Sequence, residues 1–317
     1  MTTLTVATYN VYLGADLALL FAAASRDELS ERAAVVRRQL DATDFAQRAR
    51  AIARILAREQ VDLVGLQEVT RWGSATVSDD GEVGEAETIV DFLPLLEEAC
   101  TATGTPYDVH AVNTNFGGGL PVGDRWLSIA GANVVLVRRG GPVRVVGEQT
   151  GPFERVLAMR TGIDDVSFPI TRSWGAVEVE VDGRALVFAN THTEAYDAAT
   201  RDAQRDELVA RLADRVEPLV VVGDFNCRPD DVGMPSPYLD AWRSTEGGRG
   251  DAPGHTCGQG PTLDNEESSL DERIDYVFVR GAAVRTCSVV GDQPEDRTVP
   301  GRLWPSDHAG VVARLQF

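Results

Sequence analysis

The chain has 317 residues and a net charge of −19, from 49 acidic and 30 basic residues, and all of its basic residues are arginines. The absence of lysine excludes a lysine nucleophile or Schiff base. The acidic balance argues against a protein that coats nucleic acid, although a nuclease could handle phosphate locally with a metal and a few arginines.

No segment approaches the roughly 20 apolar residues that a membrane helix requires. No basic, cleavable leader precedes the first predicted strand, so we expect a cytoplasmic protein without stable membrane insertion. The four cysteines, Cys100, Cys227, Cys257 and Cys287, show no zinc-binding spacing. We expect four free thiols, with a Cys227–Cys257 contact as the alternative.

Short β-rich runs alternate with helical segments along the chain. The predicted strands are residues 4–9, 63–66, 133–137, 176–181, 185–189, 219–222, 274–279 and 309–315. Several of them, such as 219–222, are apolar at consecutive positions, as in strands that are covered on both faces. Asp182-Gly183 supplies a hairpin turn between two of the runs.

Four helices are predicted between these strands. The first follows a capping box, Ser25-Arg-Asp-Glu28, and carries apolar residues at helical spacing to Leu40. Further apolar stripes cover residues 49–56, 93–99 (capped by Asp91) and 208–216. Helices interleaved with buried strands and hairpins predict a mixed-sheet α/β sandwich, and we expect one domain spanning residues 1–317.

Three polar or glycine-rich segments are predicted to be loops. Residues 78–87 and 264–272 are rich in acids, and we expect both to be solvated loops rather than metal sites. Residues 113–123 contain Gly117-Gly-Gly119 and predict a flexible loop. A phosphate-binding glycine loop would instead lie between a strand and a helix.

The polar residues of most interest lie where predicted strands begin or end. They are Asn10, Glu68, His192, Asp224, Asn226, Asp275, Asp307 and His308. In α/β proteins, strand ends deliver functional side chains to a common crevice. The spacing of Asp224 and Asn226 would put both side chains on one face if the strand geometry continued.

Each of these residues alone has an ordinary explanation. Asn10 or Asp224-Phe-Asn226 could be part of a turn, Glu68 a surface carboxylate, and Asp275 half of an ion pair with Arg273. His110 and His255 have the character of ordinary surface or loop residues. Chance placement of the whole set at hydrophobic strand boundaries is nevertheless improbable.

The order and the residues of these motifs resemble those of the endonuclease/exonuclease/phosphatase superfamily. The matching pieces are Thr8-Tyr-Asn10, Leu66-Gln-Glu68, Asn190-Thr-His192, Gly223-Asp-Phe-Asn226, Arg273-Ile-Asp275-Tyr and Ser306-Asp-His308. The resemblance extends from residue 4 to residue 315. It implies a four-layer α/β sandwich, with two mixed β-sheets face to face and helices outside.

The resemblance also implies a role for each site residue. Glu68, Asn10 and Asp307 would hold Mg²⁺, or Mn²⁺ in its place, because hard cations prefer oxygen ligands. His308 would be the general base, oriented by Asp275. Asp224 and Asn226 would position the nucleophile and phosphate, and His192 would contact a phosphate oxygen or the leaving group. Arg172 would be either a phosphate clamp or a structural surface arginine.

These roles predict a Mg²⁺-dependent phosphoesterase that hydrolyses a small-molecule or lipid-derived phosphodiester or phosphomonoester. The alternatives are a DNA or RNA nuclease, and a non-catalytic binding protein on the same fold. We expect a monomer that acts on a small phosphate ester. Nucleic acid as a partner is less favoured because the chain lacks a basic, aromatic-rich stripe.

One segment departs from the family pattern. The stretch between Asn10 and Glu68 is longer than is usual, and the surplus maps to a helical insertion at residues 13–44. Its apolar run at residues 17–24 either packs on the helix at 49–56 or walls the cleft and contacts the non-phosphate part of the substrate.

Overall fold

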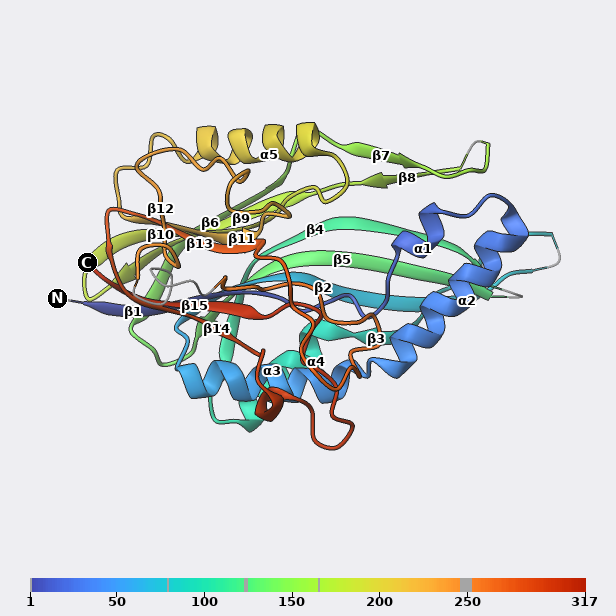
Figure 1. The fold of residues 1–317 in the computed structure, drawn as a ribbon, viewed down its shortest axis with the longest axis horizontal. Helices are drawn as coiled ribbons and strands as arrows, with labels where there is room; N and C mark the ends of the chain where they lie inside the picture. Colours follow the sequence, from blue (N-terminus) through green and yellow to red (C-terminus); the bar gives the residue numbers. More distant parts are fainter. Residues whose placement is uncertain (1, 79, 123–124, 165, 246–252) are drawn as a thin grey trace.

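Two mixed β-sheets form the centre of the protein in a computed structural model, which describes residues 2–78, 80–122, 125–164, 166–245 and 253–317 (Figure 1). The first sheet has the order β14 (Ala283–Val290), β15 (Gly310–Gln316), β1 (Thr3–Asn10), β2 (Leu63–Thr76), β5 (Arg125–Arg138) and β4 (Tyr107–Val122), with β3 (Glu87–Asp91) paired to β2. The second has the order β12 (Leu239–Asp240), β13 (Asp275–Arg280), β11 (Leu219–Asp224), β10 (Arg184–His192), β9 (Ser173–Val181) and β6 (Val143–Pro152).

Each sheet contains one parallel pair, β1 with β2 and β10 with β11, and its other pairs are antiparallel. Parallel strands need a crossover, and helices supply it in both places. The first crossover contains α1 (Ala18–Phe21), α2 (Arg26–Ala42) and α3 (Phe45–Glu59), and the second contains α5 (Ala198–Arg211). The carboxyl ends of these central strands are therefore free to carry side chains of the site.

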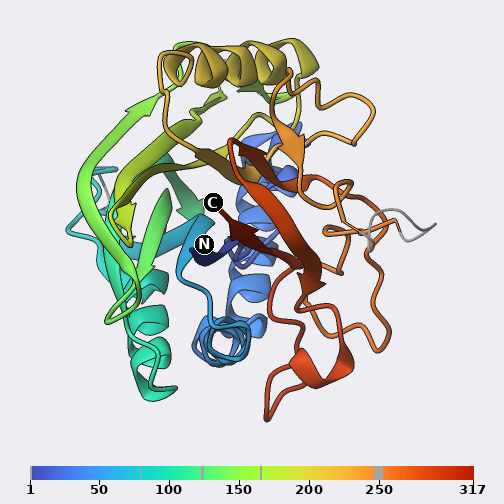
Figure 2. The same ribbon diagram turned by 90° about the vertical axis from the view of Figure 1, so that its left-hand side faces the viewer.

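The layers follow from the burial of each sheet on both faces. Leucines and valines such as Val6, Val135 and Val222 fill the space between the sheets. Apolar faces of α2, α3 and α4 (Phe92–Ala102) cover the outer face of the first sheet, and α5 covers the second. Figures 1 and 2 show α5 on one side and α3 and α4 on the other. The predicted four-layer α/β sandwich is confirmed.

Local signals at the helix starts are also confirmed. Ser25 caps α2 by accepting a hydrogen bond from the Glu28 backbone nitrogen, and Asp91 caps α4. The Glu28 carboxylate, however, reaches Ala24 rather than Ser25. The predicted helix at 208–216 is too long at its end, because α5 stops at Arg211 and Val216 is 93% exposed.

The segment 113–123 is not a flexible loop, and this prediction was wrong. Its described part, up to Val122, belongs to the long strand β4 (Gly123 lies outside the described residues). The glycine is needed here because an aromatic ring packs against the backbone, and not because the segment is flexible. A Cβ on Gly119 would lie 2.1 Å from the Trp126 indole. Glycine in a strand marks such close approaches.

Other expectations about loops and cysteines agree with the structure. The acidic segment 264–272 contains no helix and only an isolated bridge residue, and 78–87 forms a turn and leads into β3, with Asp79 outside the described residues. All four cysteines are free. None of the described helices combines the length and apolar character that a membrane span needs.

The insertion at residues 13–44 forms α1 and α2, beside a two-stranded hairpin of β7 (Leu157–Arg160) and β8 (Ser167–Ile170). Leu29, Ala33, Val36 and Leu40 of α2 are buried in the core. Figure 1 shows α1 and the hairpin together at one end of the molecule, next to the far ends of β4 and β5. A backbone hydrogen bond from Gly162 to the Ala23 carbonyl, 3.1 Å long, links hairpin and insertion.

Candidate active site

Most of the candidate site residues lie where central strands begin or end. Glu68 is an exception, because β2 continues past it to Thr76, so the predicted strand 63–66 was too short. Asn10, His192 and Asp224 are the last residues of β1, β10 and β11. Asp275 is the first residue of β13 and lies directly opposite Asp224, because these two strands run antiparallel. An antiparallel neighbour thus begins where its partner ends, so both strands bring a side chain to the same edge of the sheet.

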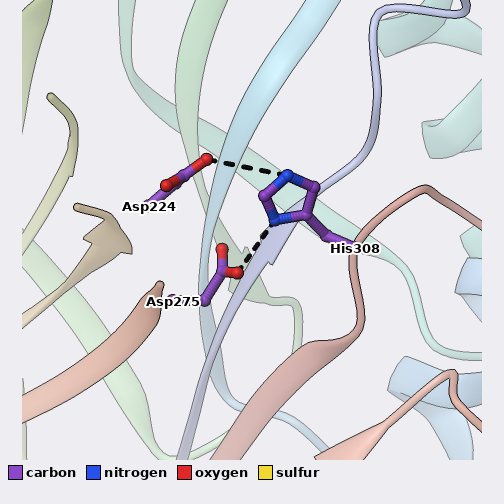
Figure 3. A group of neighbouring side chains, drawn as sticks. All are labelled: Asp224, Asp275 and His308. Carbon is purple, nitrogen blue, oxygen red and sulfur yellow. Dashed lines mark hydrogen bonds and ion pairs between the residues drawn. The ribbon is translucent and has the colours of Figure 1, made fainter. Parts of the chain in front are cut away.

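His308 lies between two carboxylates (Figure 3). Its Nδ1 is 2.9 Å from Asp275 Oδ2, and its Nε2 is 3.8 Å from Asp224 Oδ2. Burial opposes charge on the ring, but Cys257, Asp275 and Asp307 outweigh it and raise the pKa of His308 above its usual range. One ring nitrogen is therefore held by Asp275, and the other faces the interior of the site.

One oxygen of Asp224 forms the centre of the arrangement. Its Oδ2 accepts a hydrogen bond from Asn10 Nδ2 at 3.0 Å and lies 3.5 Å from His192 Nε2, besides its approach to His308. Burial, followed by the charge of Asp275, raises the pKa of Asp224 to about 6. The side chain is a buried acid that lies close to three polar groups, from the ends of β1 and β10 and from the segment before β15.

Asn226 does not continue the strand geometry of Asp224. Its φ is +47°, and its backbone nitrogen donates to Asp224 Oδ1 at 2.8 Å, which makes a turn closed by the aspartate side chain. The amide then donates to the Thr193 carbonyl at 3.0 Å. Asp224-Phe-Asn226 is thus a turn and a part of the site together, and the two side chains do not share a strand face.

Glu68 and Asp307 border a cavity of about 390 Å³ that opens beside this cluster. Glu68 interrupts the pairing of β2 with β5 at a bulge, with φ +59°, and its Oε2 accepts from the Leu13 backbone nitrogen at 2.8 Å. Burial raises the pKa of Asp307 to about 7. The charge of His308 opposes this rise, and the charge of Glu68 adds to it. Two carboxylates near each other at the edge of a cavity suit a hard divalent cation.

Asn10 has less freedom to bind a cation than these two acids. Its Nδ2 is used by Asp224, and its Oδ1 accepts from the Tyr12 backbone nitrogen at 3.0 Å. Among the described residues, Asp224, Asp275 and His308 form a group of side chains whose possible metal-ligand atoms all lie within 4.8 Å of one another. In that group Nδ1 of His308 is already bonded to Asp275. The acid and histidine donors of the site fit a divalent cation, and Glu68 and Asp307 are further carboxylates beside it that could bind one.

Arg172 and His192 are buried next to each other. Arg172 Nη1 lies 3.0 Å from Nε2 and 3.2 Å from Nδ1 of His192. Burial first, and then the charges of Arg172 and His308, lower the pKa of His192 well below its usual value. His192 is consequently neutral near pH 7. Arg172 is not a surface arginine, since it is 7% exposed and lines the cavity.

The sequence reading missed three groups that support the site. Glu194 is fully buried and lies 3.8 Å from Arg172. Arg48, on α3, is fully buried and donates to the carbonyls of Val11, Tyr12, Thr43 and Pro305. Gln67 and Asn190 join the two sheets behind the site through a 2.7 Å hydrogen bond. Glu194 and Asn190 lie two residues from His192, and Gln67 precedes Glu68. The contacts that these three side chains make with distant segments could not be predicted from the sequence.

The fold and motifs agree with comparisons to known proteins. The sequence profile of the Endonuclease/Exonuclease/phosphatase family matches residues 7–308. The chain belongs to this family. Its members are metal-dependent phosphoric ester hydrolases, and the chain is accordingly an enzyme of that class. A search of curated protein sequences returned no match.

Solved structures of the family show the same fold at low sequence identity. A Bacteroides thetaiotaomicron endonuclease/exonuclease/phosphatase family protein superposes with a TM-score of 0.60 and 20% identity, covering 100% of this chain and 98% of that one. D. rerio TDP2 complexed with single-strand DNA product has a TM-score of 0.61 and 15% identity, with 100% of both chains covered. Truncated Caenorhabditis elegans TDP2 has a TM-score of 0.58 and 18% identity, covering 99% and 98%.

Proposed function

We propose that the chain is a Mg²⁺-dependent phosphoesterase that hydrolyses the P–O bond of a small-molecule or lipid-derived phosphate ester. The observation that carries this proposal is the convergence of Asn10, His192 and His308 on one oxygen of Asp224, beside a cavity bordered by Glu68 and Asp307. Such a site combines groups for binding phosphate with groups that move a proton.

Glu68 and Asp307 would hold the cation, with Mn²⁺ able to replace Mg²⁺. When bound, the metal neutralises charge that builds on the phosphate during hydrolysis. Arg172 and neutral His192, which contact each other, would bind phosphate oxygens, and Asn226 would orient the turn that carries Asp224. Phosphate esters are among the slowest substrates to hydrolyse unaided, so electrostatic stabilisation is the main requirement.

His308 is proposed to take the proton from the attacking water. Asp275 holds Nδ1, which leaves Nε2 free on the side of Asp224. The water oxygen would bond to phosphorus as the P–O bond to the ester oxygen breaks, and the leaving oxygen would take a proton from solvent. A second assignment has support: Asp224 would accept the proton and protonated His308 would bind a phosphate oxygen, because the pKa of His308 is raised. The pH dependence of turnover separates the two.

A nuclease is the second candidate function. It is favoured by the D. rerio TDP2 structure, which holds a single-strand DNA product. The net charge of −19 argues against it, since nucleic-acid binding relies on many positive contacts to phosphates. A non-catalytic binding protein is the third candidate, and retention of the complete acid, amide and histidine set argues against that.

The test is a substrate screen with and without chelator. Bis-p-nitrophenyl phosphate, p-nitrophenyl phosphate, a phospholipid and plasmid DNA are each incubated with Mg²⁺, and with the metal removed. We expect metal-dependent release of product from at least one small or lipid ester and little cleavage of plasmid. Rapid, salt-sensitive degradation of plasmid alone would instead support the nuclease. Turnover of none of the four would contradict the proposal.

A further inference from the structure

The cavity beside the active site is apolar over most of its wall. Its lining includes Leu17, Leu20 and Phe21 of α1 and its N-cap, together with Ile129 of β5 and Phe168 of β8. Glu68, Asp307 and Arg172 lie on the same cavity, so its interior is continuous with the proposed phosphate site. A volume of about 390 Å³ falls within the ~300–1,000 Å³ that is usual for small-molecule sites.

The insertion builds one wall of this cavity. The Phe21 ring contacts the Phe168 ring, with 5.6 Å between centroids, and the Tyr196 ring at 5.5 Å in an edge-to-face arrangement. Its apolar run therefore does not simply pack on α3, which was the ordinary explanation for it. Three segments distant in the sequence meet at Phe21.

Hydrogen bonds fix this wall to the rest of the protein. The Asp16 backbone nitrogen donates to Gln39 of α2 at 2.9 Å, and Arg32 donates to the Leu19 carbonyl at 2.8 Å. Trp72 of β2 donates to the Leu13 carbonyl at 2.8 Å. The wall is thus held from α2 and from the first sheet, and the cavity is built into the fold rather than left by an unattached loop.

We propose that this cavity binds an apolar chain carried by the substrate, so that the enzyme prefers amphiphilic phosphate esters with an alkyl or acyl group close to the phosphate. The inference rests on the proposed function, because it takes Glu68, Asp307 and Arg172 as the phosphate site. Water in such a cavity finds few polar partners, so an apolar chain replaces it favourably. A nucleotide chain, with a charge at every phosphate, has no matching cations along this wall among the described lining residues except Arg172.

Gly118 offers a direct way to fill the cavity. In β4 it pairs with Ile129 and shares a strand face with Leu120, which pairs with Leu127, and all four line the cavity. A Cβ added at Gly118 would meet no atom within 4 Å, and its φ is not positive, so a side chain fits without clash or strain. Gly118→Leu should therefore project into the space that the alkyl chain would occupy.

The experiment uses p-nitrophenyl phosphodiesters of methanol, butanol and octanol, which share one leaving group and differ only in chain length. For the wild type, kcat/KM should rise by about fourfold per methylene that the cavity buries, from the usual transfer free energy of a methylene. Gly118→Leu should flatten this dependence, and Phe21→Ala, which opens the wall, should weaken it. The control is Thr114→Leu, an exposed leucine on the same strand outside the cavity.

Binding is measured separately from turnover, by calorimetry with methyl phosphate and octyl phosphate in the presence of Mg²⁺. If octyl phosphate binds more tightly than methyl phosphate, and Gly118→Leu removes the difference, the inference about the cavity is supported. If no diester is cleaved in addition, only the proposed function fails. Equal kcat/KM and equal affinity for short and long chains overturn the inference, while cleavage of the methyl ester leaves the proposed function intact. Preference for a dinucleotide over octyl esters also overturns it.

Discussion

The backbone nitrogen of Leu13 donates to Glu68 Oε2 at 2.8 Å, so the insertion begins with a hydrogen bond to a proposed metal ligand. Leu13 is itself held by Trp72 through its carbonyl. The same residue thus joins the carboxylate, the first sheet and the cavity wall. The active site and the segment that we expect to select the substrate are therefore parts of one bonded unit.

Removal of the His308 side chain should reduce turnover by about 10²–10⁴-fold, the usual contribution of a positioned acid or base. His308→Ala is compared with His110→Ala, a histidine of β4 that lies outside the site and pairs with Glu148. Rates are measured at saturating Mg²⁺ on a confirmed substrate. Near-normal turnover by His308→Ala would remove this residue from the mechanism.

The pH–rate profile should rise as His308 loses its proton. Asp275 raises the pKa of His308, so Asp275→Asn should lower that pKa and move the acid limb to lower pH, besides slowing the reaction. If Asp224 is the base instead, the profile also falls at high pH as His308 loses its proton, and His308→Gln removes that fall. A profile with no ionisation affected by either variant contradicts both assignments.

Glu194 is expected to be a positioning residue for Arg172. The Arg172 Nε and Glu194 Oε2 atoms are buried, 3.8 Å apart and without a hydrogen-bond partner among the described residues. Without this counter-charge the guanidinium loses its orientation. Glu194→Gln should therefore weaken the affinity for inorganic phosphate by about 10-fold or more. That is the usual contribution of one hydrogen bond to a charged group, here the bond from Arg172 to the phosphate.

The measurement for Glu194 is calorimetry with phosphate and Mg²⁺, together with separate kcat and KM values. Glu207→Gln is the control, because Glu207 pairs with Arg211 on α5 at 2.7 Å and does not line the cavity. A structural role alone would lower the unfolding temperature of Glu194→Gln without changing phosphate affinity. That result would rule out a positioning role.

Arg48 should be important for stability. It is fully buried, and its guanidinium satisfies four backbone carbonyls from segments far apart in the sequence. Arg48→Met leaves these acceptors without their donor, and each unsatisfied buried group costs about 1–3 kcal/mol. We expect the free energy of unfolding to fall by at least ~3 kcal/mol in urea denaturation. Arg50→Met, an exposed arginine on the same helix, should change it by less than ~0.5 kcal/mol.

The sequence predicted the central strands and several of the polar residues at their ends because both depend on local patterns. Residues 219–222 are apolar at consecutive positions and Asp224 follows them after one glycine, while the apolar run 276–279 is preceded directly by Asp275. The antiparallel pairing of β11 with β13 then brings Asp224 and Asp275 opposite each other. The family motifs add the order in which these ends meet.

The features that were missed depend on contacts across the fold. The run Gly117-Gly-Gly119 is typical of a loop, and only the contact between Gly119 and the Trp126 indole explains why it lies in a strand. Glu194 reads as an ordinary polar residue after a strand, and its burial depends on Arg172 and on Gln204 of α5, which accepts from its backbone nitrogen. Arg48 lies in an alanine- and arginine-rich helix, and nothing local shows that its partners include Pro305.

Metal dependence tests the central claim most directly. Turnover of bis-p-nitrophenyl phosphate, or of the best ester from the screen, is measured for the wild type, for Glu68→Gln and for the control Glu85→Gln in the exposed acidic segment. We expect chelation to abolish turnover, and Mg²⁺ or Mn²⁺ to restore it in the wild type and in Glu85→Gln. Glu68→Gln should need a higher metal concentration because it loses a carboxylate ligand while its fold, followed by circular dichroism, is kept. Full turnover by the metal-stripped enzyme, or an unchanged metal requirement in Glu68→Gln, would contradict the account.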